Sequence, residues 1–103
     1  MKTRRHPGEY IQRVYMEPLD ITATELADRL DISPSTMSRI LNKKIDISYE
    51  MAVRLSTVLG RTPESWINLQ TEYSLCFAEQ KVNKQNLKPI YATPVTFTAE
   101  TIS

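Results

Sequence analysis

The sequence predicts an all-α fold of five helices followed by an extended C-terminal tail. Apolar residues recur at helical spacing in successive segments of residues 7–78. Hydroxyl residues precede several of these segments and are followed by proline at Ser33-Pro34 and Thr62-Pro63, which is typical of helix starts. Residues 79–103 instead combine prolines with β-branched and aromatic residues, which indicates extended chain.

The central stretch, residues 22–44, predicts two short helices joined by a tight turn. Thr22 and Glu25 can form a capping box, in which each side chain satisfies an amide at the start of the first helix. The turn Asp31-Ile32 is followed by Ser33-Pro34, which starts the second helix. The predicted apolar faces are Leu26, Ala27 and Leu30 in the first helix and Met37, Ile40 and Leu41 in the second. This is a helix-turn-helix arrangement.

The outer face of the second helix points to DNA. It has no acidic residue between Ser33 and Lys44, whereas an ordinary surface helix mixes acids and bases. Arginine and asparagine can bond bidentately to bases, and lysines suit phosphates, so we expect Arg39 to make the main base contact. The predicted DNA-binding residues are Thr24, Ser33, Pro34, Ser35, Thr36, Ser38, Arg39, Asn42, Lys43 and Lys44. The structural alternative is a helical hairpin used only for packing.

The composition of the chain limits how it could bind DNA. The chain has 103 residues, enough for one domain with its own core, and a formal net charge of only +1. Any DNA affinity must therefore come from a local patch, strengthened when two chains bind together. One cysteine, Cys76, excludes an internal disulfide, and no apolar run reaches membrane length, so we expect a cytoplasmic, nucleoid-associated protein.

Catalytic and metal chemistry has no support in the sequence. His6 is the single histidine, Cys76 lies in an apolar run, and there is no glycine-rich phosphate loop. These residues form neither a catalytic constellation nor a set of metal ligands, so we expect no enzyme activity, no metal and no cofactor.

The N-terminal part predicts a basic arm, residues 1–6, and then a helix from Pro7 to about Met16. The arm is either solvated or touches phosphate or a minor groove. We expect Pro18 to end the helix and Leu19 and Ile21 to pack inward. The predicted apolar face of the helix is Tyr10, Ile11, Val14 and Tyr15.

The last two helices follow Ser48 and Thr62, with Gly60 as the C-cap between them. Apolar residues of the final helix, residues 64–78, cover more than one side. Part of this surface meets either a second copy or the tail of the same chain. The predicted dimerisation residues are Trp66, Leu69, Tyr73 and Phe77.

The C-terminal tail, residues 79–103, alternates apolar and polar residues at Val95–Thr98 as a strand would. No local partner strand exists in a helical chain. The tail is therefore either disordered or pairs with a second copy or another protein.

The segment from His6 to Leu75 resembles the HigA-type antitoxins of the Xre/Cro-like helix-turn-helix class. The most specific motifs are HPGE (residues 6–9), EPLDIT (residues 17–22) and TPESWINLQ (residues 62–70). One departure is Asp31, which stands where this class usually has a glycine; aspartate tolerates the left-handed backbone that such a turn requires.

The resemblance implies a homodimeric, five-helix repressor that binds an inverted repeat in double-stranded operator DNA. It also implies neutralisation of a HigB-like toxin that cleaves mRNA, and repression of the operon encoding both proteins. None of the toxin biology follows from residue spacing. The alternatives are a stand-alone repressor without a toxin and a protein-binding module whose helix-turn-helix no longer binds DNA.

Overall fold

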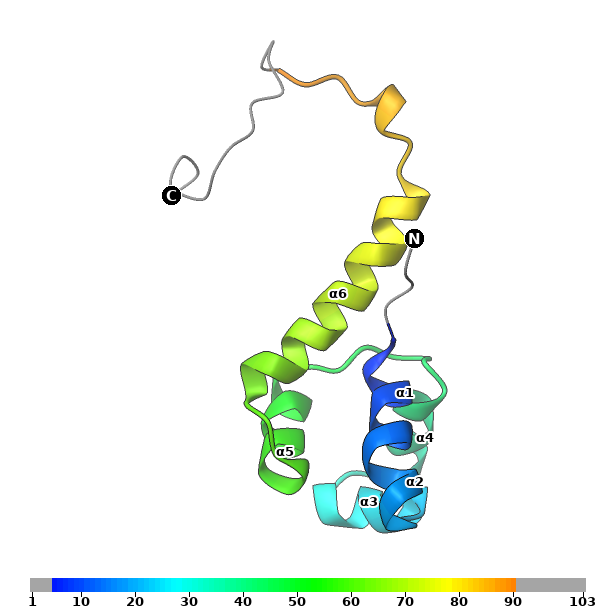
Figure 1. Ribbon diagram of the computed structural model, residues 1–103, viewed down its shortest axis with the longest axis vertical. Coiled ribbons are helices and arrows are strands. Elements are labelled where there is room, and N and C mark those ends of the chain that lie inside the picture. The colour runs from blue at the N-terminus through cyan, green and yellow to red at the C-terminus, as the bar shows by residue number, and fades with distance from the viewer. Residues whose placement is uncertain (1–4, 91–103) are drawn as a thin grey trace.

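The computed structural model describes residues 5–90, and these form an all-α bundle. The first helix consists of three consecutive segments, α1 (Pro7–Ile11), the π-helical turn η1 (Gln12–Met16) and α2 (Glu17–Leu19). Four helices follow, α3 (Ala23–Leu30), α4 (Pro34–Leu41), α5 (Tyr49–Leu59) and α6 (Pro63–Lys81), and then a 3-10 turn, η2 (Lys84–Asn86). Figure 1 shows α1 beside α4, while the C-terminal half of α6 projects away from the bundle. The predicted five-helix fold is confirmed.

The helix starts are those that the sequence predicts. The side chains of Thr22, Ser33, Ser48 and Thr62 each accept a hydrogen bond from the amide three residues later. The capping box is complete, because the Thr22 amide also donates to Glu25 Oε1 at 2.9 Å. Gly60 ends α5 with φ 101°. These local bonds fix where the helices begin and therefore the direction of α4, the second helix of the helix-turn-helix, which is termed the recognition helix in this motif.

The first helix differs from the prediction at its C-terminal end. Pro18 does not end it, because the wider π turn precedes this proline and the helix continues to Leu19. The same turn changes the face that each later residue presents. Val14 and Leu19 are 42% and 62% exposed, so their predicted inward packing was wrong, whereas Ile21 does pack against the core.

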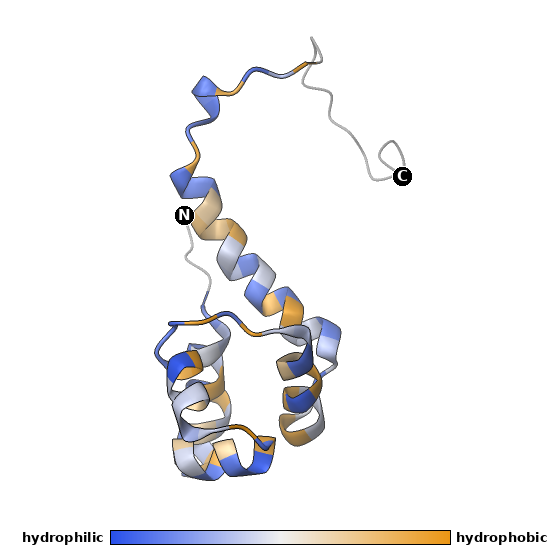
Figure 2. Ribbon diagram, turned by 180° about the vertical axis from the view of Figure 1, so that it is seen from behind, coloured by the Kyte–Doolittle hydropathy of each residue, from blue (hydrophilic) through white to orange (hydrophobic). Residues whose placement is uncertain are grey.

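One hydrophobic core joins the five helices. It contains the predicted faces of α3 and α4 and, from the other helices, Ile11, Met51, Ala52, Leu55 and Trp66. Trp66 is fully buried and its Nε1 donates to the Gly60 carbonyl at 2.8 Å. In Figure 2 hydrophobic and hydrophilic residues alternate along the short helices, as amphipathic helices around one core require.

The end of α6 and the chain after it lie outside this core. The helix runs to Lys81, three residues further than predicted, and residues 81–90 are exposed. Leu75 and Phe77 on its outer half are 56% and 43% exposed. The predicted strand at Val95–Thr98 lies beyond the described residues, as does most of the N-terminal arm. No helix in residues 5–90 is both long and apolar enough to span a bilayer.

Candidate nucleic-acid interface

The start of α1 is fixed by its first three residues. His6 is 1% exposed and its Nδ1 accepts the Gly8 amide at 2.9 Å, so it serves as the N-cap, and Pro7 takes the first helical position. Gly8 lies against the end of α4, where any Cβ would collide with the Ile40 carbonyl. The HPGE motif therefore caps α1 and allows it to approach the recognition helix closely.

A second contact holds α1 to the end of α4. Gln12 Nε2 donates to the Leu41 carbonyl at 3.2 Å and satisfies one of the free carbonyls at the helix C-terminus. Sequence reasoning missed this residue, because a polar side chain on a helix gives no sign of its partner. With Gly8, it makes α1 and α4 a single packed unit.

The exposed face of α4 carries several of the predicted DNA-binding residues. Ser35, Ser38, Arg39 and Asn42 are exposed, opposite the buried Met37, Ile40 and Leu41. Asn42 Nδ2 donates to Ser38 Oγ at 3.2 Å, which orients the asparagine along the face. No hydrogen bond or ion pair between described side chains uses the Arg39 guanidinium. Its donors are therefore available to a ligand on this face.

At the other end of α4, the hydroxyls serve the helix start first. Ser33 Oγ accepts the Thr36 amide at 3.1 Å and donates to Thr36 Oγ1 at 2.9 Å. Ser33 and Thr36 are therefore already engaged with each other, and Thr36 is half-buried. Pro34, like Thr24 in the first turn of α3, is exposed.

The turn between α3 and α4 contains the charged residue Asp31, whose partner the sequence did not predict. Asp31 adopts the predicted left-handed conformation, with φ 59°, and its carboxylate is almost fully exposed. Arg54 on α5 donates to the carbonyls of Leu30 at 2.9 Å and Asp31 at 3.1 Å, and its Nη1 lies 3.8 Å from the Asp31 carboxylate. Arg54 thus caps the end of α3 and offsets the aspartate charge beside the recognition helix.

The two lysines after α4 have different surroundings. Lys43 has φ 62° and its Nζ lies 3.8 Å from Glu9 of α1, while the Lys44 amide donates to the Arg39 carbonyl at 2.8 Å. Both side chains are exposed. The absence of acids from the α4 sequence therefore does not mean the absence of acids nearby, because Glu9 approaches from another helix.

The predicted dimerisation residues differ widely in exposure. Trp66 is a core residue and cannot reach a second chain, so we withdraw it from the candidate surface. Leu69 packs against the core, and Tyr73 makes an edge contact with the His6 ring at 4.8 Å between centroids. Phe77 is the most exposed of the four.

Gln70 connects α6 to the loop after the recognition helix. Its Oε1 accepts the Ile47 amide at 3.0 Å, and its Nε2 donates to Asp46 Oδ1 at 3.2 Å and Ser74 Oγ at 3.1 Å. The side chain is 7% exposed. Sequence reasoning missed it, because the glutamine lies among residues that read as one amphipathic helix.

A family model described as Helix-turn-helix matches residues 13–67. The chain belongs to the helix-turn-helix family. Among curated members of this family, the uncharacterized HTH-type transcriptional regulator YddM of Escherichia coli K12 is 40% identical over 90 residues, which is 85% of this chain and 95% of the relative.

Solved structures of helix-turn-helix proteins agree with the fold over most of the chain. The antitoxin GraA superposes with a TM-score of 0.82 at 32% identity, over 87% of this chain and all of the other. Pseudomonas aeruginosa antitoxin HigA, solved with the higBA promoter, gives 0.78 at 33% identity, over 84% of this chain and 98% of the other. The predicted likeness to HigA-type antitoxins is confirmed.

Proposed function

We propose that this chain is the antitoxin of a type II toxin-antitoxin pair and a dimeric repressor of its own operon. In this role the α4 face binds an inverted repeat in operator DNA, and another surface neutralises a HigB-like, mRNA-cleaving toxin. The observation that carries the DNA-binding part is the exposed Ser35, Ser38, Arg39 and Asn42 face, whose arginine has no partner among the described side chains. The likeness to an antitoxin solved with promoter DNA supports it.

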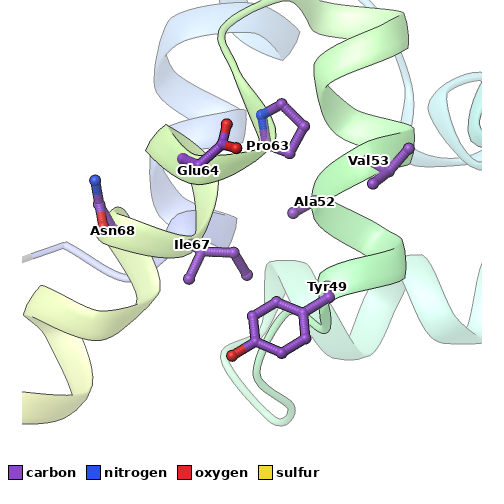
Figure 3. Close-up of a pocket in the computed structure, with 7 residues that line it drawn as sticks. All are labelled: Tyr49, Ala52, Val53, Pro63, Glu64, Ile67 and Asn68. Atoms are coloured by element: carbon purple, nitrogen blue, oxygen red, sulfur yellow. The ribbon is translucent and has the colours of Figure 1, made fainter.

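For the dimer, the structure offers a surface that the sequence did not indicate. A groove of about 350 Å³ separates α5 from the start of α6, and Figure 3 shows Tyr49, Val53 and Ile67 around its opening. Tyr49 is 79% exposed and Val53 is 53% exposed. A two-fold interface requires a self-complementary patch, and an exposed ring beside an apolar hollow has that form. We propose this groove as the contact between two copies, with Phe77 as the competing site.

Two substitutions separate these surfaces. Tyr49→Ser in the groove should shift the protein from dimer to monomer in analytical ultracentrifugation, whereas Phe77→Ser on the outer half of α6 should leave the dimer intact. The reverse result would place the interface on α6, as the sequence predicted. Circular dichroism of both variants checks that the fold is unchanged.

The toxin partner rests on likeness to antitoxins rather than on any described contact. A plain repressor is the second candidate, and the relative YddM, whose name gives only transcriptional regulation, favours it. The two differ in one respect: an antitoxin must bind the product of a neighbouring gene.

The decisive experiment is a mobility shift of the full chain on its own upstream promoter at near-physiological salt, with and without the product of the adjacent gene. A specific shift at nanomolar protein that changes when the neighbour is added supports the antitoxin-repressor function. A shift indifferent to the neighbour leaves a plain repressor. Tight binding to the neighbour with no specific shift rejects DNA binding and the role of Arg39.

A further inference from the structure

Three cations surround one carboxylate at the edge of the recognition helix. Arg5 Nε lies 3.7 Å, Arg13 Nη1 3.8 Å and Lys43 Nζ 3.8 Å from the nearest Glu9 carboxylate oxygen. The four groups together have a net charge of +2. Each of the three cationic side chains is about half exposed, so these long ion pairs contribute little to stability. The cluster keeps a positive surplus that its own carboxylate does not neutralise.

This cluster is fixed to the recognition helix. Gly8 packs directly on the Ile40 carbonyl and Gln12 bonds the Leu41 carbonyl, so the α1 residues between and beside them are held at the C-terminal end of α4. Lys43 follows α4 and contacts both helices. Its amide donates to the Ile40 carbonyl at 3.1 Å, and its Nζ lies 3.8 Å from Glu9 of α1. When α4 lies in a groove, Arg5 before α1 and Arg13 in η1 must therefore lie at a set position beside it.

The position continues the surface already expected to face DNA. Lys43 and Lys44 directly follow α4. Arg13 in η1 and Arg5, just before α1, extend the positive charge from them onto the first helix. The backbone phosphates beside a groove are the anions that such an extension would meet, and arginine binds phosphate with a planar fork of donors.

We propose that Arg5, Arg13 and Lys43 form a phosphate-binding site for the DNA backbone at the flank of each half-site, with Glu9 as its internal competitor. The proposal rests on the proposed DNA-binding function and extends its surface to the first helix and the residue before its N-cap. Phosphate oxygens replace the Glu9 carboxylate as partners of the arginines. The bound ligand is sequence-independent, so this site adds affinity and positions α4 without reading bases.

The test measures binding of the full chain to an operator duplex and to an unrelated duplex by fluorescence anisotropy, over a series of salt concentrations. Arg13→Gln and Arg5→Gln should each weaken binding to both duplexes about fivefold at 0.15 M salt. Each should also reduce the salt slope by about 0.9 per bound chain, and so by about 1.8 for a dimer on two half-sites, as loss of one phosphate contact per chain requires. Glu9→Gln should strengthen binding to both duplexes, because it removes the competing carboxylate.

Lys81→Gln at the end of α6 is the matched control, since it also removes one exposed positive charge but lies on the projecting helix. The proposal is overturned when the arginine variants bind like the wild type, or when Lys81→Gln lowers affinity and slope equally, which would be a net-charge effect. A wild-type protein that binds neither duplex rejects the DNA-binding function itself. Thermal unfolding of each variant confirms that the exposed substitutions leave the fold intact.

Discussion

Gln70 on α6 accepts the Ile47 amide at 3.0 Å and so holds the loop that follows the recognition helix. The Gln70 side-chain Nε2 donates to Asp46 and Ser74, so this side chain forms a buried junction between α6 and the α4–α5 connection. The loop between α4 and α5 is therefore held against α6 by hydrogen bonds as well as by apolar contacts. The position of α6, and of any chain bound to it, is thereby connected to the end of α4.

Replacing Gln70 by alanine should lower the free energy of unfolding by about 1–3 kcal/mol, because the Ile47 amide loses its partner in a buried place. Urea unfolding followed by circular dichroism measures this. Gln80→Ala is the matched control, since Gln80 lies on the same helix but is exposed, and it should change stability by less than about 0.5 kcal/mol. Equal effects of the two substitutions would show that the junction contributes nothing.

Replacing Arg39 by alanine should cost about 1–3 kcal/mol of operator binding and relax specificity at one base pair. The reason is that a free guanidinium on the α4 face can bond bidentately to a base edge. Anisotropy titrations against the operator and its single-base variants test this. Unchanged operator affinity, or a loss that is uniform across all sequences, would remove Arg39 from base reading.

Gly8→Ala should both destabilise the protein and weaken operator binding. A Cβ at this position meets the Ile40 carbonyl, so α1 must move away from the recognition helix. Gly60→Ala is an informative comparison, because that position has open space around it and only its φ of 101° is unfavourable. It should lower stability without a specific loss of DNA affinity. The two variants are compared at a temperature where both remain folded.

Stability should fall with acidification through the ordinary range of histidine. Burial lowers the pKa of His6 below its usual 6.5, although the Ile45 carbonyl, Asp46 and Glu9 oppose this effect and Lys43 reinforces it. Because the unfolded state then binds the proton more readily, the neutral-His6 contribution is complete above about pH 6.5 and is lost as pH falls from 6.5 toward the lower folded pKa. Protonation of Nδ1 would also remove the acceptor that caps α1 at Gly8.

Urea unfolding at pH 7.5 and pH 5.5 measures the His6 contribution, and His6→Asn is the control because its side chain can still cap α1. The variant should lose most of the difference between the two pH values. A separate effect at lower pH comes from a carboxyl group. Hydrogen bonds from Thr22 lower the pKa of Glu25, so its contribution to stability is present above its ordinary pKa and disappears at more acidic pH. A wild type with equal stability at both pH values would contradict the role of His6.

The sequence predicted the helices well because caps are local. The Thr22–Glu25 box, the Ser33-Pro34 start and the left-handed Asp31 each depend on neighbours within three residues, and all are present. The α4 face followed from helical period alone. What failed was the geometry after Gln12, where a π turn changed which side of the helix Val14 presents, since no short pattern announces such a turn.

Contacts between distant segments were not predictable in the same way. Arg54 with Asp31, Gln70 with Ile47 and Gly8 with Ile40 join residues 23 to 32 positions apart, and one sequence carries no record of such pairs. Trp66 shows the opposite error, since an apolar residue on a crowded helix was assigned to an interface when it fills the core. Whether an apolar residue faces the core or a partner depends on packing that periodicity does not describe.

The close fit of α1 on α4 has a consequence for protein engineering. The recognition helix is held by the backbone carbonyls of Ile40 and Leu41, while the outward positions Ser35, Ser38, Arg39 and Asn42 take no part in that attachment. These four side chains can therefore be exchanged as a cassette for those of another operator preference. The packing of α1 on α4 should stay the same in such variants. The α4 atoms that α1 contacts are main-chain carbonyls, which do not depend on the residues placed at the outward positions.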